Sequence, residues 1–164
     1  MHARRLDLLG ALTAFEFVVP DHVIAEITEP AQRQVLEIAL TRGALRQESI
    51  TDPRELATYA GLRRIMGSGE AACLAMAEAR GWLIASDEKR RFRREVIARL
   101  GEGHLVTTAG LFVIAIRAGA ISAEEADQVK EILQRHHFRM AFKSFRELLE
   151  LSRLGKYNPP SCRG

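Results

Sequence analysis

The chain has 164 residues, of which 47% are hydrophobic and 27% charged, with a net charge of +3 and a sequence pI near 9.2. This composition is typical of one soluble globular domain with a real core, and the two cysteines, Cys73 and Cys162, exclude a disulfide framework. The mild positive charge permits an anionic partner without requiring one.

Neither a targeting segment nor a membrane span is expected. Asp7 and Glu16 interrupt any apolar region of a signal peptide near the N-terminus. The longest uncharged run, 103–116, has 14 residues, whereas a bilayer requires about 20. We therefore expect a cytoplasmic protein that does not enter the membrane.

The first half of the chain alternates helical and extended patterns. Apolar spacing and capping signals predict these elements in order: a helix over 5–13, a strand over 15–19, helices over 22–28 and 30–41, a weak strand over 45–50, and a helix from 53 to about 65. Asp21 is a plausible N-cap for the second of these helices.

The second half begins with a turn at Gly67 and Gly69. The following residues, 70–80, are nearly all small or apolar, which predicts a helix buried against a sheet. The remaining pattern predicts a strand over 82–85, a basic helix over 88–99, a strand over 104–106, helices over 109–118, 123–135 and 142–154, and a loose tail over 155–164. Strands that alternate with helices favour a parallel sheet covered on both faces.

Acidic residues stand where these elements begin or end. Glu26 lies on an early helix, Glu70 in the first turn of the buried helix, and Asp87 directly after a strand. Carboxylates at the carboxyl ends of parallel strands are candidate ligands for Mg²⁺ or Mn²⁺, which could activate a water and stabilise a leaving oxygen. Taken singly, each acid fits an ordinary role better: Glu70 as a first-turn acid, Asp87 as a helix cap and Glu26 as a solvated side chain.

Other motifs carry less information. The histidines lack zinc-like spacing, and Gly67-Ser68-Gly69 fits plain turn chemistry better than a phosphate-binding loop. The arginine-rich helix directly follows Asp87, so its arginines fit a phosphate-binding surface and a solvated helix face equally well.

Several segments together resemble the PIN-domain family, in particular its short prokaryotic members described as nucleic-acid-binding proteins. The similarity spans residues 6 to about 150 and is carried by these segments: Leu6-Asp7-Leu8-Leu9, Val18-Val19-Pro20, Val23-Ile24-Ala25-Glu26, Gly67-Ser68-Gly69-Glu70-Ala71, Leu83-Ile84-Ala85-Ser86-Asp87-Glu88, Arg91, Val106-Thr107-Thr108-Ala109-Gly110, Arg117-Ala118-Gly119-Ala120-Ile121 and His137-Phe138-Arg139-Met140.

The resemblance implies an α/β fold, a three-layer α/β/α sandwich around a central parallel sheet, formed by a single domain over 1–154. Many PIN domains are metal-dependent ribonucleases, often the toxins of toxin–antitoxin pairs, and many dimerise. RNA, an antitoxin protein and a second copy of the chain are therefore the partners that the resemblance implies.

The family's cluster of acids can be placed residue by residue. Glu26, Glu70 and Asp87 match acids that ligate Mg²⁺ or Mn²⁺ and carry catalysis, and Glu88, where the branch often has Asp, is an alternative ligand. Ser86 matches the small hydroxyl residue before the last acid. The residues expected to contact the substrate are Arg90, Arg91, Arg94 and Thr108.

One departure from the family pattern affects the site. The family's first strand, which carries an Asp, lies upstream of the segment matched by Leu6-Asp7-Leu8-Leu9, and Asp7 is no substitute for it. The resemblance therefore predicts a fold that lacks its first strand and exposes two strand edges and a face of the core.

Three hypotheses follow. The first is a metal-dependent ribonuclease of PIN type, whose activity requires that the first-strand Asp be restored. The second is a catalytically impaired PIN-like module that binds nucleic acid or a protein. The third and weakest is another magnesium-dependent α/β protein such as a phosphatase, for which an Asp-x-Asp pair at a first strand is absent.

Overall fold

The chain alternates short strands with helices in a computed structural model that describes residues 5–88 and 90–153. The strands are β1 (Val18–Pro20), β2 (Arg46–Glu48), β3 (Ile84–Ala85) and β4 (Leu105–Val106). The helices are α1 (Asp7–Ala11), α2 (Asp21–Glu26), α3 (Pro30–Thr41), α4 (Pro53–Leu62), α5 (Ser68–Arg80), α6 (Arg91–Leu100), the 3-10 helix η1 (Glu102–His104), α7 (Thr108–Arg117), α8 (Ala123–Arg135) and α9 (Phe145–Arg153).

The strands pair in parallel, as expected, but they form two separate two-stranded sheets. In one sheet β1 pairs with β2, with Val18 opposite Arg46, and in the other β3 pairs with β4, with Ile84 opposite Leu105. The described residues therefore form an α/β fold without the single central sheet that the sequence predicted. Each of β1 and β3 keeps one unpaired edge.

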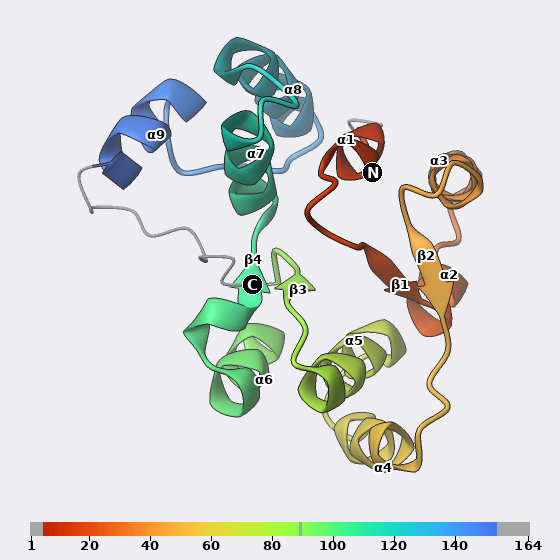
Figure 1. Ribbon diagram of the computed structural model, residues 1–164. Coiled ribbons are helices and arrows are strands. Elements are labelled where there is room, and N and C mark those ends of the chain that lie inside the picture. The colour runs from red at the N-terminus through yellow and green to blue at the C-terminus, as the bar shows by residue number, and fades with distance from the viewer. Residues whose placement is uncertain (1–4, 89, 154–164) are drawn as a thin grey trace.

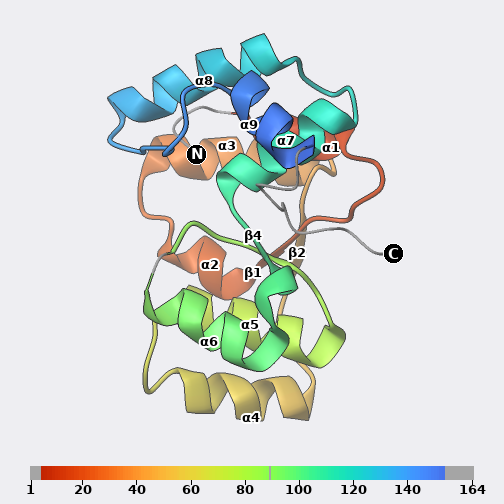
Figure 2. The same cartoon turned by 90° about the vertical axis from the view of Figure 1, so that its left-hand side faces the viewer.

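Two groups of helices lie on either side of the strands (Figures 1 and 2). One group contains α1, α7, α8 and α9, whose apolar side chains form a core around Val113 and Phe145. The other contains α4, α5 and α6, whose core surrounds Leu74 and Val96. The strands thus lie between two distinct hydrophobic clusters.

Helix α5 is the buried helix that its composition predicted. Its residues Ala71, Leu74 and Ala75 have no exposed surface. Gly81 ends the helix with a left-handed backbone, φ +68°, which glycine adopts without strain. Because α5 contacts both β1 and β3, it connects the two sheets on one face.

Several element boundaries differ from those expected. The last helix begins at Phe145 instead of 142, because the Ser144 hydroxyl accepts a hydrogen bond from the Glu147 N–H and Asp127 accepts one from the Phe145 N–H. The basic helix begins at Arg91, after a turn in which the Ser86 hydroxyl accepts from the Glu88 N–H. The expected tail 155–164, with Cys162, lies outside the described residues.

Among the residues that the structure describes, no helix is both long enough and apolar enough to span a membrane.

Candidate functional site

The first half of the candidate site is a pair of glutamates at the N-terminal end of α5. Glu26, from α2, accepts a hydrogen bond from the Gly69 N–H at 2.9 Å. Glu70, in the first turn of α5, accepts one from the Gly67 N–H at 3.1 Å. The first amides of a helix have no partner within the helix and carry a partial positive charge, so they favour carboxylates. The same helix end therefore holds both side chains.

The approach of Glu26 depends on the absence of a side chain at Gly69. A Cβ at that position would lie 2.6 Å from Glu26 Oε2 and 3.1 Å from Val23 Cγ2. A Cβ at Gly67 would lie 3.7 Å from both Glu26 Oε1 and Glu70 Oε2, so this turn lies between the two carboxylates. The glycines let backbone and carboxylate come close together.

No cation among the described residues neutralises the two carboxylates. Neither forms an ion pair among the described residues, and the Glu26 side chain is exposed. Their negative charge extends to Cys73 on the next turn of α5. Burial, with a further contribution from Glu26 and Glu70, raises the pKa of that thiol to about 11. Cys73 is therefore a neutral thiol at physiological pH.

Asp87 lies at a second helix end. Its carboxylate accepts a hydrogen bond from the Thr108 N–H at 3.1 Å and a short one from the Thr108 hydroxyl. Thr108 is the first residue of α7, whose N-cap is the Thr107 side chain. Asp87 thus joins the end of β3 to the beginning of α7 and takes the capping role that we considered for it, although on a later helix than expected.

The acids predicted from the sequence are only partly brought together. Glu26 and Glu70 meet at α5, whereas Asp87 lies at α7. Within residues 5–88 and 90–153, no three His, Cys, Asp or Glu side chains are grouped closely enough to hold a metal ion. The paired carboxylates have the oxygen chemistry that Mg²⁺ and Mn²⁺ prefer, so they fit such an ion in kind but do not complete its coordination.

The arginines expected at the substrate are distributed along α6 and just before it. Arg90 and Arg94 are exposed, and Arg94 lies 3.9 Å from Glu95. Arg91 donates a hydrogen bond to the Ile65 carbonyl at 2.6 Å and so connects α6 to the turn that follows α4. Glu88 is exposed and lies in the turn after Asp87.

The role of the glycine turn was missed by sequence reasoning. We interpreted Gly67-Ser68-Gly69 as plain turn chemistry, but its N–H groups hold both glutamates. The Ser68 hydroxyl also makes a 2.9 Å hydrogen bond with Tyr59 on α4. A signal was present, because small residues directly before a first-turn acid mark an accessible helix end, where anionic groups bind.

Helices lie on both sides of the parallel strands, and acidic residues lie on the segments that follow β1 and β3. These features define an α/β protein with acidic groups at its strand and helix ends. A family model described as a PIN domain matches residues 1–153. The chain therefore belongs to the PIN-domain family, as the resemblance predicted. No curated protein and no solved structure shows a significant match to this chain.

Proposed function

We propose that this PIN-domain protein is a metal-dependent ribonuclease. The family has a nuclease-type fold, and its members generally bind nucleic acid and divalent metal ions. The observation that supports the proposal most is the pair formed by Glu26 and Glu70, two carboxylates held side by side without a cation among the described residues. Two carboxylates at one helix end repel each other, and a bound cation would relieve that repulsion.

In this proposal Glu26 and Glu70 would hold Mg²⁺ or Mn²⁺ at the N-terminal end of α5, and Asp87, which lies at the N-terminal end of α7, would complete its coordination, with Glu88 as an alternative ligand. When bound, the ion supplies positive charge that stabilises the leaving oxygen of a phosphodiester and makes a water more acidic. The Gly67 and Gly69 N–H groups each fix one carboxylate oxygen, which orients the glutamates. Thr108 does the same for Asp87 through its N–H and hydroxyl groups.

The exposed arginines next to Asp87 would bind the RNA backbone. Arg90 and Arg94 have guanidinium groups open to solvent, and both follow Asp87 closely in the chain. Contacts of this kind recognise phosphates without regard to sequence and weaken as salt rises. Binding should therefore be salt-dependent and tolerant of RNA sequence.

The test is cleavage of a fluorescent single-stranded RNA in the presence of Mn²⁺ by the purified chain, with the Asp-bearing first strand of the family pattern restored at its N-terminus, compared with Glu70→Gln and Asp87→Asn variants of the same protein. Each substitution keeps the shape of the side chain and removes its charge, so cleavage should fall at least about a hundredfold if the carboxylate binds the ion. Glu37→Gln, at an exposed position on α3, is the matched control and should cleave as the unmodified chain does. Equal cleavage by all four proteins would overturn the proposal.

A second candidate function is a PIN-like module that binds nucleic acid or protein without cleaving RNA. It is favoured by the separation of Asp87, engaged by Thr108, from the glutamate pair. This module would be supported over the nuclease if the chain bound RNA but did not cleave it at any Mn²⁺ concentration. Replacing Arg90 and Arg94 by Ala should then abolish the RNA binding.

The finer role of toxin in a toxin–antitoxin pair extends the nuclease proposal. Expression of a toxin should arrest cell growth, and the Glu70→Gln substitution should relieve that arrest. A small antitoxin protein expressed with the chain should also relieve it. Sedimentation of the purified chain would test the homodimer that we proposed from the resemblance.

A further inference from the structure

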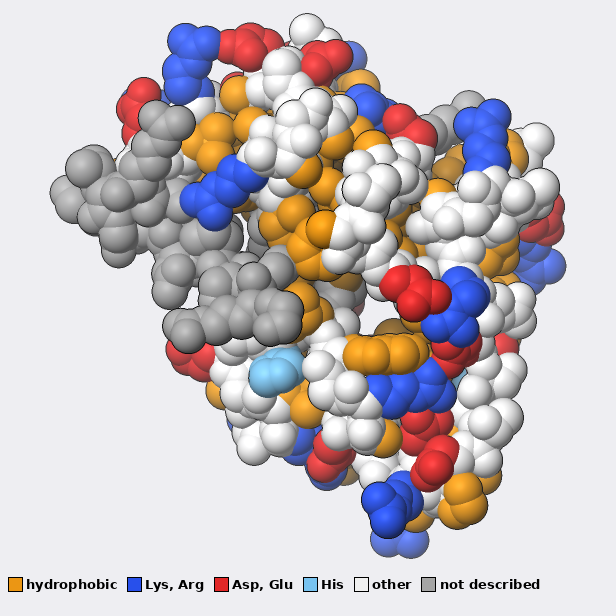
Figure 3. All heavy atoms as spheres, in the orientation of Figure 1, with side chains coloured by type: hydrophobic (Ala, Val, Ile, Leu, Met, Phe, Trp, Pro, Cys, Tyr) orange, Lys and Arg blue, Asp and Glu red, His pale blue; other side chains and the backbone are white. Residues whose placement is uncertain are grey.

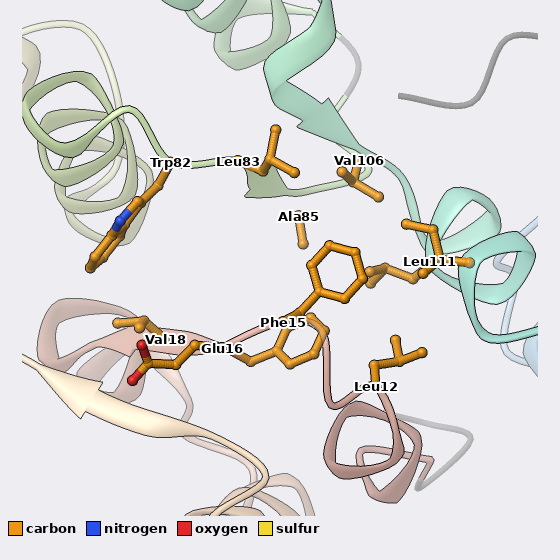
Figure 4. A pocket seen from close by; sticks show the side chains of 11 residues that line it. Leu12, Phe15, Glu16, Val18, Trp82, Leu83, Ala85, Val106 and Leu111 are labelled. Carbon is orange, nitrogen blue, oxygen red and sulfur yellow. The ribbon is translucent and has the colours of Figure 1, made fainter. Parts of the chain in front are cut away.

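An apolar cavity of about 250 Å³ separates the two sheets, but it does not contact the glutamate pair. Figure 3 shows the surface hollowed between the two parts of the molecule, and Figure 4 shows the side chains around the cavity. Of the residues that line it, only Glu16 is charged, and neither Glu26 nor Glu70 is among them. The positions of these two carboxylates are therefore set elsewhere, by groups around the N-terminal end of α5.

Tyr59, on α4, contacts both helices that carry the glutamates. Its ring centroid lies 4.7 Å from that of His22, which belongs to α2 and precedes Glu26 by about one helical turn. Its hydroxyl makes a 2.9 Å hydrogen bond with the hydroxyl of Ser68, the first residue of α5. The ring also packs against the core that α4, α5 and α6 share, which restrains it. Tyr59 therefore connects α2 with α5 at the end where Glu26 and Glu70 meet.

Ser68 lies between the two amides that hold the carboxylates. The Gly67 N–H donates to Glu70 at 3.1 Å, and the Gly69 N–H donates to Glu26 at 2.9 Å. Because glycine has no side chain to pack, the backbone at these two positions is restrained mainly by its neighbours. Ser68 supplies the side chain of this three-residue turn, and the tyrosine hydroxyl is its hydrogen-bond partner. A displacement of Ser68 would move both amides and, with them, both carboxylates.

We propose that Tyr59 is a positioning residue, which sets the separation of the Glu26 and Glu70 carboxylates through its hydrogen bond to Ser68. Ligand oxygens must lie at defined distances for a divalent ion to bind, most strictly for Mg²⁺. Groups that orient metal ligands from outside contribute about tenfold to a hundredfold to metal affinity. The inference rests on the metal-dependent function proposed above, because a bound ion is what makes the separation of the carboxylates matter.

The first test measures the turn without metal. Tyr59→Phe removes the hydroxyl and keeps the ring, so the packing on His22 and on the core persists. Amide hydrogen exchange at Gly67 and Gly69, followed by NMR, should become about fivefold faster, the factor expected when a hydrogen bond of average strength is lost. Unchanged exchange at both glycines would overturn the proposal.

The second test measures the dissociation constant for Mn²⁺ by isothermal titration calorimetry. Tyr59→Phe should raise this constant at least about tenfold, and Ser68→Ala should do the same. The double variant should bind Mn²⁺ no more weakly than either single variant, because both changes remove one and the same hydrogen bond. Additive losses would show that the two side chains act separately and would overturn the proposal.

A matched control separates positioning from general stability. Thr41→Val removes a hydroxyl at the exposed end of α3 and should leave glycine exchange and Mn²⁺ affinity unchanged. A side chain that only stabilises the fold changes the free energy of unfolding, whereas the dissociation constant of the folded protein stays the same. Equal Mn²⁺ affinity in Tyr59→Phe and Thr41→Val would therefore refute the positioning role.

Failure of this inference can be told apart from failure of the proposed function. If the unmodified chain binds Mn²⁺ and Tyr59→Phe binds it equally well, the metal site stands and the role of Tyr59 falls. If the unmodified chain binds no Mn²⁺, the proposed function falls, and the role of Tyr59 as a positioning residue for a metal site falls with it.

Discussion

Two pairs of glutamates lie close together in this protein, Glu48 with Glu55 and Glu26 with Glu70. They differ in whether an arginine of the fold forms ion pairs with them. Arg80 lies between Glu48 and Glu55, donating to the Glu55 carboxylate at 2.5 and 3.0 Å and forming an ion pair with Glu48. Glu55 is only 2% exposed. No described residue forms an ion pair with Glu26 or Glu70, and the Glu26 side chain is exposed.

We propose that this difference separates the acids that stabilise the fold from those that bind a metal ion. A buried carboxylate must be paired because leaving it without a partner costs several kcal/mol. Arg80 supplies that partner within the fold and also stacks on Trp82, 4.5 Å from the ring centre. The Glu26 and Glu70 pair is stabilised only by the amides of α5, which leaves capacity for an external cation. The proposed metal site is therefore the pair that lacks an arginine.

The largest expected difference between the pairs is in stability. Glu55→Gln removes one partner of a buried ion pair and should lower the free energy of unfolding by about 3 kcal/mol. Glu26→Gln keeps an oxygen that can accept from the Gly69 N–H and relieves repulsion with Glu70, so its effect should stay below about 1 kcal/mol. Urea denaturation measures both, and equal losses would contradict the distinction.

Mn²⁺ should stabilise the chain through the unpaired carboxylates. At a metal concentration ten times the dissociation constant, the free energy of unfolding should rise by about 1.4 kcal/mol, visible as a higher Tm. Glu26→Gln and Glu70→Gln should abolish this rise, whereas Glu37→Gln should retain it. A rise that persists in both of the first two variants would show that the ion binds at another site.

Gly69→Ala tests how closely Glu26 must approach the helix. The new Cβ would lie 2.6 Å from Glu26 Oε2 and would also press on Val23, so the carboxylate should leave its amide. We expect a loss of about 1 kcal/mol relative to Gly61→Ala, which adds a Cβ in open space on α4. If urea denaturation gives the same free energy of unfolding for both variants, the close approach of Glu26 does not contribute to stability.

The smallest expected effect is on pH dependence. Hydrogen bonding and the charge of Arg80 hold the pKa of Glu48 below its ordinary value of 4.5. Since the folded pKa is depressed, this contribution to stability is present above about pH 4.5 and is lost as the pH falls through the folded pKa. Unfolding followed from pH 6 to pH 2 should show a shallower acid loss in Glu48→Gln than in the unmodified chain.

The local elements were largely predictable because they depend on neighbouring residues. The small apolar run in α5 predicted a buried helix, and Ser122 with the acids after it predicted the beginning of α8. The family pattern also predicted exposed strand edges, and in the two sheets of the described residues each strand has one unpaired edge. The separation into two sheets was not expected, because pairing depends on which edges meet in space.

The long-range contacts of the candidate site could not be predicted from the sequence. Glu26 meets Gly69 across 43 positions of the chain, and Asp87 meets Thr108 across 21. Neither pair has a local pattern that links its members. The resemblance selected the acids, but only the fold shows that Glu26 and Glu70 share one helix end and that Asp87 occupies another.

The cavity between the sheets also affects how the molecule loses its structure. It separates the cluster around Val113 and Phe145 from the cluster around Leu74 and Val96, so few apolar contacts bind one core to the other. Cooperative unfolding requires that the loss of one core remove contacts from the other. The two helical groups should therefore melt as separate units, with two heat-absorption peaks in calorimetry.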